Sequence, residues 1–551
     1  MLPANAAYKT APSMSPSQIA LSMAPPSPAE PQRRRVRPAR LPRTRLPDKL
    51  DPVKRVLPPQ ESTVSARWRA ALALVCVLGV MPARGEEIPG EPVRGAPALV
   101  KRLDAALAHP SLRGSQIAAL VVDAETGGVL YAHDPDRALV PASNVKILTG
   151  VAVLAALGPA HRFATEVLAN RVPDAEGAVD TLYVRGGGDP ALTSEELWRL
   201  AADLRRGGLR KVREALVVDA SLFDDERWHP SWGPVSARAY HAPIAGLTVN
   251  YAAFAARVVP GARPGDAVEV TLDPAVDGLR VVNRVRTVQR GAEHEKLDFE
   301  RRRAEGFEEV LVSGMLRAGG EPVTLYRSVL DPVAYAASVL RLQLEANGVE
   351  VASAGGRGTI PEDAVALLRF EGRPLGEVVR LFMKYSNNAI GEGLVKALAA
   401  RAGKVPATWP AGIAAVRDEL ARLGVGVEPI TLVDGSGLSY ANRVSPRVLV
   451  EALRLAAGAF RFGPEFVSSL PIAAADGTLE ERFEGSAGAV RAKTGNLTRV
   501  TALSGYVRRA DGRTAIFSLL VNGYRGEAEE VWRGVDGFAE ELTTTVEGPL
   551  P

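Results

Sequence analysis

An almost wholly apolar segment, residues 147–157 (ILTGVAVLAAL), constrains the fold of this 551-residue chain more than any other feature. Gly158-Pro159 follows at once, and such a pair is typical of a helix end. A helix that is apolar on every side must be covered on every side. The segment therefore predicts a buried helix.

Ser143 and Lys146 stand three residues apart at the start of this helix. The spacing places a hydroxyl and an amine on one helix face. Backbone N–H groups and the positive dipole end lie at a helix N-terminus, and a lysine in low dielectric tends to lose its proton. The pair is a candidate serine nucleophile with its base. Alternatively, Ser143 caps the helix and Lys146 is solvated, because S-x-x-K arises by chance on the order of once in such a chain.

The first 60 residues differ from the rest in charge and composition. They contain 11 Lys/Arg and 3 Asp/Glu, a balance of +8, so the remainder sums to −4 although the whole chain carries +4. We therefore expect no nucleic-acid binding by the folded part. Richness in Pro, Arg and Ser without apolar periodicity indicates that residues 1–63 are disordered or a mis-annotated N-terminal extension.

Residues 64–85 have the charged, apolar and small-residue sections of a secretory signal peptide. Their apolar run, Ala70 to Met81, is short for a bilayer span. We expect cleavage, a periplasmic or other extracytoplasmic location, and at most peripheral membrane association. A retained signal-anchor and a buried core helix are the alternatives. The only cysteine, Cys76, lies in this run, so a cleaved chain contains no disulfide.

Hydrophobic periodicity changes twice along the remaining chain. Helix and strand patterns near each end of this part surround a middle part of short strands broken by turns, with one predicted helix at 195–206. The predicted elements outside the middle part are helices at 98–108, 331–344, 374–383 and 527–542, and strands at 116–123, 129–134, 489–494, 500–508 and 514–522. We expect an α/β (α+β) fold in which an antiparallel sheet is flanked by helices. Residues 95–170 and 331–545 form this catalytic domain, and 171–330 form a large strand-rich inserted domain.

Two further motifs follow Ser143 in the chain. Ser386-Asn387-Asn388 comes after an amphipathic helix, and Lys493-Thr494-Gly495 ends a predicted strand. The ordered set S-x-x-K, S-x-N, K-T-G is that of penicillin-binding proteins and serine β-lactamases. Each motif alone has an ordinary explanation, a helix cap or a turn glycine. Together they predict an active-serine acyl enzyme.

Peptide acyl transfer gives each catalytic residue a role. Ser143 attacks and Lys146 takes its proton. Ser386 relays the proton to the leaving amine, while Asn388 hydrogen-bonds Lys146 and a substrate amide. The backbone N–H groups of Ser143 and Asn496 form the oxyanion hole.

The K-T-G strand is expected to bind the substrate. Lys493 supplies positive charge for a terminal carboxylate, and Thr494 adds a hydroxyl group. Gly495 lets the strand backbone lie close to the ligand.

On these motifs the sequence resembles the D-alanyl-D-alanine carboxypeptidase/endopeptidase family, class C low-molecular-mass penicillin-binding proteins (peptidase family S13). That family has a long region between its first two motifs, and Ser143 and Ser386 are 243 residues apart here. Four more stretches resemble it: 185–190 (RGGGDP), 218–221 (VDAS), 434–439 (DGSGLS) and 476–479 (DGTL). The resemblance implies a penicillin-binding, β-lactamase-like transpeptidase fold, no cofactor, peptidoglycan peptides as substrates and β-lactams as covalent inhibitors.

Two positions depart from the family pattern. Tyr440 stands where the family often has Arg, with Arg443 three residues on, and Asn496 stands where Thr or Ser is usual. In the family an acidic group on the insertion and that Arg frame a diaminopimelate side chain, and Asp219 is the expected acidic group here. We therefore expect the peptide specificity, rather than the chemistry, to differ.

Other classes of protein fit the sequence less well. A serine β-lactamase needs a deacylating base, which no motif marks, and a non-catalytic cell-wall binding protein would have lost Ser143, Lys146 or Lys493. The six histidines lack metal-ligand spacing, and no P-loop occurs, so we expect neither a metal nor a nucleotide.

Overall fold

The computed structural model describes residues 96–289, 296–353 and 355–544, all within one unit of the chain, Gly85–Pro551. The expected extension (1–63) and signal peptide (64–85) lie outside the described residues. In the part that is described, no helix combines the length and apolarity needed to cross a membrane.

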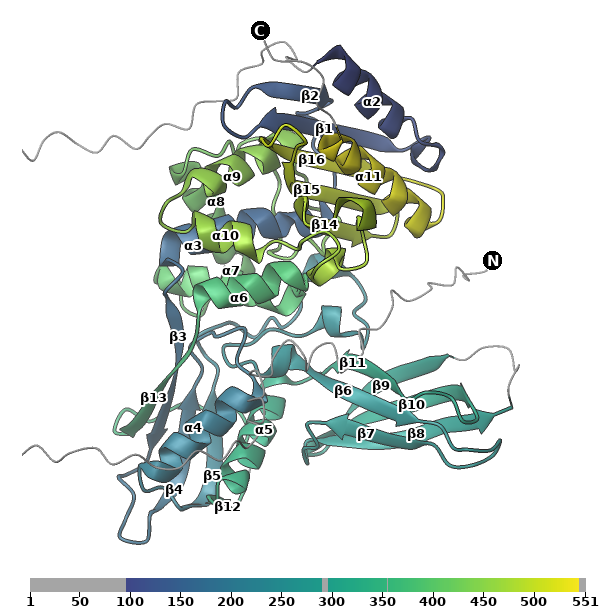
Figure 1. Cartoon of the computed structure of the whole chain (residues 1–551). Helices are drawn as coiled ribbons and strands as arrows, with labels where there is room; N and C mark the ends of the chain where they lie inside the picture. The colour runs from purple at the N-terminus through teal and green to yellow at the C-terminus, as the bar shows by residue number, and fades with distance from the viewer. Residues whose placement is uncertain (1–95, 290–295, 354, 545–551) are drawn as a thin grey trace, which may run out of the picture. The chain divides into compact units, whose positions relative to one another are not determined.

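A five-stranded antiparallel sheet joins the two ends of the described chain (Figure 1). Its strands, in spatial order, are β14 (Val490–Leu497), β15 (Val500–Arg508), β16 (Thr514–Asn522), β1 (Gln116–Asp123) and β2 (Val129–His133). Strand β1 pairs with β16 along its whole length, from Gln116 opposite Asn522 to Asp123 opposite Ala515. Strands β15 and β16 are buried almost throughout, which is the pattern of a sheet covered on both faces. The expected antiparallel sheet flanked by helices is confirmed.

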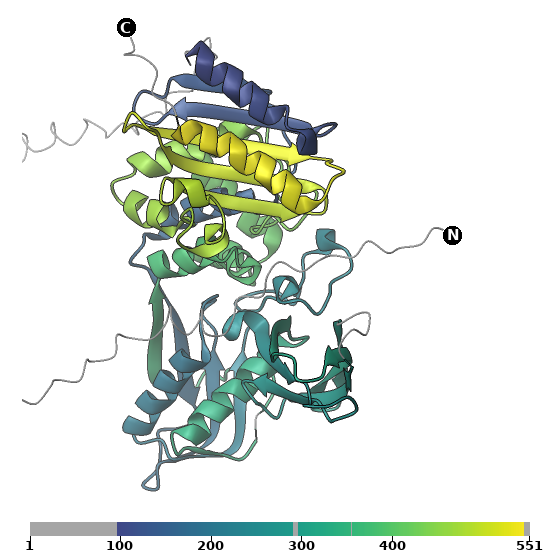
Figure 2. The ribbon, with the colours of Figure 1, turned by 45° about the vertical axis from the view of Figure 1, so that its right-hand side comes forward.

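Helices cover both faces of this sheet (Figures 1 and 2). On one face lie α2 (Pro97–Leu107) and α11 (Ala528–Thr543), whose apolar sides share a core with the sheet. On the other face α9 (Pro446–Gly458) packs against β1 and β16.

The predicted apolar helix is α3 (Val145–Leu157), and eleven of its thirteen residues are buried. Five helices pack against it: α6 (Leu375–Lys384), α7 (Asn388–Arg401), α8 (Trp409–Arg422), α9 and α10 (Gly463–Ser469). This enclosure explains why α3 has no polar face. It also brings the segment before α3, which carries Ser143, into the middle of the helical layer.

A second five-stranded sheet differs in membership from the expected domain boundaries. Its strands, in spatial order, are β12 (Glu350–Val351), β5 (Lys211–Asp219), β4 (Ala178–Arg185), β3 (Arg162–Ala169) and β13 (Val365–Pro374). Helices α4 (Ser194–Arg206) and α5 (Pro332–Ala346) pack together beside it. Four elements therefore lie with β4 and β5 although they were expected in the catalytic part. These are β3, from the part before 170, and α5, β12 and β13, from the part after 331. The reason is the antiparallel pairing of β3 with β13 across about 200 residues of chain, which local periodicity does not show.

Two three-stranded sheets complete the inserted part. One contains β11 (Val323–Ser328), β6 (Ala253–Val259) and β7 (Glu269–Asp273); the other contains β8 (Leu279–Val288), β10 (Phe307–Arg317) and β9 (Leu297–Ala304). Strands β8 and β10 are parallel, and the other pairs in these sheets are antiparallel.

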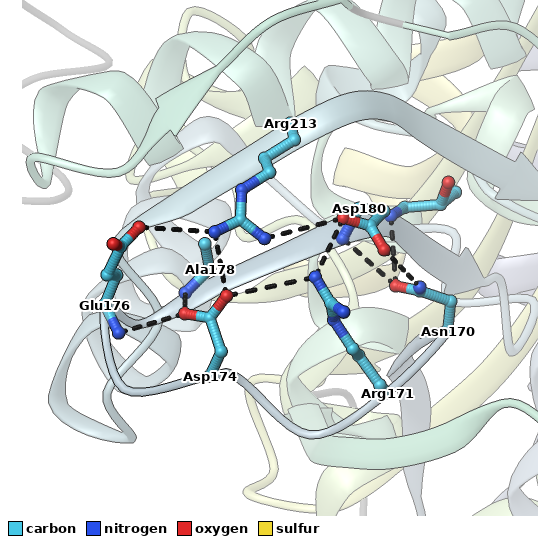
Figure 3. A network of polar contacts seen from close by, with 8 residues as sticks. Asn170, Arg171, Asp174, Glu176, Ala178, Asp180 and Arg213 are labelled. Atoms are coloured by element: carbon cyan, nitrogen blue, oxygen red, sulfur yellow. Dashed lines mark hydrogen bonds and ion pairs between the residues drawn. The ribbon is translucent and has the colours of Figure 1, made fainter.

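The connection between β3 and β4 is held by an acidic turn (Figure 3). The carboxylate of Asp174 accepts hydrogen bonds from the backbone N–H groups of Glu176 and Ala178, each at 3.0 Å. Arg213 on β5 donates to the same carboxylate at 2.8 Å. The Ala178 hydrogen bond, aided by Arg213, lowers the pKa of Asp174. Because Asp174 and Arg213 are partly exposed, their contribution is to the shape of the turn more than to stability.

Candidate active site

Ser143 lies in the 3-10 turn η2 (Ala142–Asn144), immediately before α3. The preceding residue, Ala142, has φ of 47°, a left-handed conformation that is unfavourable for a residue with a Cβ atom and is enriched at functional sites. The neighbouring Gly437 leaves no room for a side chain, since a Cβ atom there would lie 1.9 Å from the Ala142 carbonyl oxygen. The segment that contains Gly437 therefore lies directly against the backbone of Ala142.

Lys146 is fully buried and points its amine at three oxygen atoms. Its Nζ lies 3.0 Å from Ser143 Oγ, 2.8 Å from Asn388 Oδ1 and 2.6 Å from the carbonyl oxygen of Ser436. The structure therefore brings together two of the three predicted motifs through one amine.

The environment of Lys146 favours the neutral amine. Burial lowers the pKa of Lys146 from 10.5 to about 7, although the negative charges of Glu392 and Asp434 act to raise it. A base with a pKa near neutrality is matched to proton transfer at physiological pH.

The S-x-N segment forms the junction of α6 and α7. Ser386 is half-buried and has a left-handed φ of 54°. Asn387 caps α7 by accepting a hydrogen bond from Ile390 N at 3.1 Å. Asn388 Nδ2 donates to the Tyr240 carbonyl at 3.0 Å, so its Oδ1 is directed to Lys146. Within the described chain the Ser386 hydroxyl makes no hydrogen bond, and its role stays a prediction.

The K-T-G motif lies on β14, beside Ser143. Asn144 Nδ2 donates to the Lys493 carbonyl at 3.2 Å. A Cβ atom on Gly495 would lie 2.9 Å from the Pro141 carbonyl oxygen and 3.1 Å from Ser143 N. Glycine is therefore required for the close approach of β14 to the serine segment. Asn496 follows on the exposed side, and its Oδ1 accepts a hydrogen bond from Thr501 at 3.0 Å.

Lys493 is the second fully buried amine of the site. Its Nζ donates to the Thr494 carbonyl at 2.8 Å. Burial, followed by the positive charges of Lys146 and Arg482, holds the pKa of Lys493 well below its ordinary value of 10.5. A bound anion would offset this loss of hydration and repulsion.

A partly buried ion pair lies between the S-x-N and K-T-G segments. Lys384, two residues before Ser386, binds both carboxylate oxygens of Asp476, at 2.7 and 2.6 Å. Thr478, in the same turn as Asp476, is hydrogen-bonded through its hydroxyl to the Thr494 hydroxyl at 2.8 Å. The sequence showed 476–479 only as a stretch that resembles the family. In the structure its Thr478 contacts the K-T-G strand.

Sequence reasoning missed Glu392, a fully buried carboxylate on α7. It holds the backbone of Gly435 and Ser436, and Ser436 in turn accepts from Lys146. The signal in the sequence is an acidic residue within the apolar and small residues 389–395, four positions after Asn388, which places both on one helix face.

Tyr440 lies at the edge of this cluster. Its side chain is about half exposed, and its hydroxyl donates to the carbonyl of Thr498 at 3.4 Å, just beyond the K-T-G strand. Arg443 donates to the backbone carbonyls of Tyr440 and Asn442 at 2.6 and 2.8 Å. The guanidinium is therefore bound to its own loop, and Arg443 does not replace the missing arginine at 440 in this conformation.

Asp219 does not join these residues. It ends β5, where its carboxylate accepts from Ser221 N at 2.9 Å and lies 3.7 Å from Arg185. Arg185 lines a cavity of about 340 Å³ together with Arg401, the last residue of α7. Asn388 begins α7, so roughly 20 Å of helix separates the two ends. Asp219 makes no contact with Ser143, Lys146 or Lys493 in the described chain, and its framing of a substrate amine stays a prediction.

In the comparison with protein-family models, residues 99–542 match the "D-Ala-D-Ala carboxypeptidase 3 (S13) family". A D-alanyl-D-alanine carboxypeptidase of Actinomadura sp. (strain R39) is 38% identical over 443 residues, which cover 77% of this chain and 81% of that protein. The D-alanyl-D-alanine carboxypeptidase DacB of Haemophilus influenzae is 28% identical, with 75% and 86% covered.

A solved structure agrees with these sequence matches. Penicillin binding protein 4 (dacB) from Haemophilus influenzae superposes with a TM-score of 0.68 at 26% identity, over 80% of this chain and 98% of that one. The same protein complexed with a β-lactam gives a TM-score of 0.65.

Proposed function

The chain belongs to the D-Ala-D-Ala carboxypeptidase 3 (S13) family, and on that basis we propose that Ser143 is the nucleophile with which it cleaves peptidoglycan stem peptides. The enzyme is a serine-type D-Ala-D-Ala carboxypeptidase or endopeptidase. The observation that carries the assignment of the site is the set of three contacts made by the buried Lys146 amine with Ser143, Asn388 and Ser436.

The contacts of Lys146 support its role as the base. A neutral amine has two N–H groups and one lone pair. Asn388 Oδ1 and the Ser436 carbonyl can only accept hydrogen bonds, so they take the two N–H groups. The remaining lone pair is directed to the Ser143 hydroxyl, 3.0 Å away, which can donate its proton.

The reaction then has two steps. Ser143 Oγ bonds to the carbonyl carbon of the penultimate D-Ala while its proton passes to Lys146, and the bond to the terminal D-Ala nitrogen breaks as that nitrogen gains the proton. Water next releases the shortened peptide and regenerates the hydroxyl. In the endopeptidase reaction the leaving amine belongs to a second, cross-linked peptide. Ser386, two residues before Asn388, is proposed to carry the proton to the leaving nitrogen.

The oxyanion is proposed to bind the N–H groups of Ser143 and Asn496. Gly495 supports this assignment because its backbone runs against Ser143 N, the position where two donors from different segments can converge. Lys493 and Thr494 are proposed to bind the terminal carboxylate of the substrate. A β-lactam presents a strained amide beside a carboxylate and fits the same groups.

The substrate implies an extracytoplasmic enzyme, and we propose export through the signal peptide expected at residues 64–85. The folded enzyme then begins near Glu86. Release of D-Ala from a synthetic stem pentapeptide by the wild-type protein, with none by Ser143→Ala, is the expected result of an activity assay. Equal release by both proteins would contradict the assignment of Ser143.

A further inference from the structure

Glu392 is a buried carboxylate surrounded by hydrogen-bond donors. Its Oε2 accepts from Gly435 N at 3.0 Å and from Trp409 Nε1 at 2.8 Å, and its Oε1 accepts from Ser436 N at 2.8 Å. All three partners are donors, so the hydrogen bonds favour the ionised form of Glu392.

The peptide that Glu392 holds is part of the environment of Lys146. Ser436 donates its N–H to Glu392 and accepts from Lys146 Nζ through its carbonyl at 2.6 Å. The adjacent Gly435 is fixed on both sides, because its carbonyl accepts from Thr149 on α3 at 2.9 Å. The Ser436 carbonyl is thus positioned by two side chains rather than by a helix or strand: Glu392 holds the preceding peptide through Ser436 N, and Asp434 accepts from Gly437 N, in the carbonyl's own peptide unit, at 2.8 Å.

We propose that Glu392 is a positioning residue of the acylation step, which fixes the Ser436 carbonyl and so directs the Lys146 amine toward Ser143. The inference rests on the proposed function of Ser143 and Lys146. Without Glu392, one N–H group of Lys146 loses its fixed acceptor, and the lone pair is no longer confined to the direction of the Ser143 hydroxyl.

Several charged groups surround this carboxylate and bear on its titration. Burial and the charge of Asp434 raise the pKa of Glu392 to about 7. The negative charge of Glu392 acts to raise the pKa of Lys146 on α3 and of Lys396 on α7. His229, on the loop before η3 (Pro230–Trp232), feels the charge of Asp434, and burial lowers its pKa. Loss of the charge at position 392 therefore favours the neutral form of Lys146.

The substitution Glu392→Gln separates these effects from simple loss of structure. In either orientation the amide NH₂ of Gln faces a donor, and the less unfavourable orientation leaves Ser436 N–H without an acceptor. We expect the maximal rate of acylation by benzylpenicillin to fall about 10- to 100-fold, the scale of one lost buried hydrogen bond to a charge. The acylation rate falls at low pH as Lys146 becomes protonated, and we call this fall the acid limb. It should move to lower pH in Glu392→Gln, because the negative charge that raises the pKa of Lys146 is gone.

Two further variants make the test specific. Glu392→Asp keeps the charge but cannot reach both N–H groups, so its rate should fall while its acid limb stays near that of the wild type. Glu308→Gln is the matched control: Glu308 is also buried and accepts from Leu330 N at 2.7 Å, on β10. Its rate and acid limb should equal those of the wild type.

The outcomes distinguish the inference from the proposed function. Unchanged rates in both Glu392 variants would overturn the inference alone. Alternatively, Glu392→Gln is slower with an unchanged pH dependence of the rate, and loses as much of its thermal midpoint as Glu308→Gln does. That result would overturn the inference and show that Glu392 has a structural role. Wild-type protein that benzylpenicillin does not acylate would contradict the proposed function and this inference with it.

Discussion

Lys146 Nζ lies 3.0 Å from Ser143 Oγ, and the amine is completely shielded from solvent. The two residues are three positions apart, but the shielding comes from distant parts of the chain, α7 and the loop at 435–437. The sequence spacing therefore supplies the pair, and the tertiary structure supplies the dielectric environment that makes the amine a base.

Removal of the amine tests Lys146 as the base. In Lys146→Met a side chain of similar length fills the space without a proton acceptor, so the acylation rate should fall at least about 100-fold, the usual scale for a general base. The measurement is stopped-flow acylation by a reporter β-lactam. Lys396→Met is the control: it removes another buried amine, paired with Asp224 at 2.5 Å, and should lower the thermal midpoint without changing the rate per folded molecule. A normal rate in Lys146→Met would show that the lysine is not the base.

The acylation rate of the wild type should rise with pH through about 7. Burial lowers the pKa of Lys146 to about 7, so the amine is protonated and inactive as a base below this pH and neutral above it. Acylation rates measured from mildly acidic to alkaline pH will show the pH at which the rate rises. A limb near the ordinary lysine value of 10.5 would contradict the shielding seen here.

Binding of a carboxylate ligand should be coupled to proton uptake. The pKa of Lys493 is held well below 10.5 in the free site, and an adjacent anion favours the protonated amine. Calorimetry of a stem peptide binding to Ser143→Ala, in buffers of different ionisation enthalpy, measures the protons taken up. The same peptide with an amidated C-terminus is the control and should show less uptake. Equal uptake by both peptides would show that Lys493 does not meet the terminal carboxylate.

Tyr440 predicts only a modest preference for a diaminopimelate stem peptide. Tyrosine cannot form the bidentate pair that arginine makes with a carboxylate, and Arg443 is bound to its own backbone. We expect Tyr440→Arg to raise the preference, measured as the ratio of kcat/KM for two matched pentapeptides, by about 10- to 100-fold. A wild-type preference above roughly 1000-fold would mean that another residue holds the side-chain carboxylate.

Local signals in the sequence predicted the elements of the site well. The apolar run at 147–157 forms α3, and the strand predicted at 489–494 is β14, which carries Lys493. These signals depend only on neighbours in sequence, such as the end of α3 at Gly158-Pro159.

Long-range pairing was not predictable in the same way. Strand β3 was expected with the catalytic residues but pairs with β13, with Thr165 opposite Phe370, and no local pattern specifies that register. The surroundings of Asp219 were not predictable for the same reason, since they depend on the parallel pairing of β5 with β4. Glu392 went unnoticed because only the fold shows that it faces Gly435 and Ser436.

The mass of the protein after exposure to benzylpenicillin tests the central claim most directly. Since Lys146 and the close approach of Gly495 prepare Ser143 for attack, we predict one adduct per chain. Peptide mapping should place it on Ser143, and Ser143→Ala should keep its original mass. An unchanged wild-type mass, or an adduct that persists in Ser143→Ala, would contradict the account.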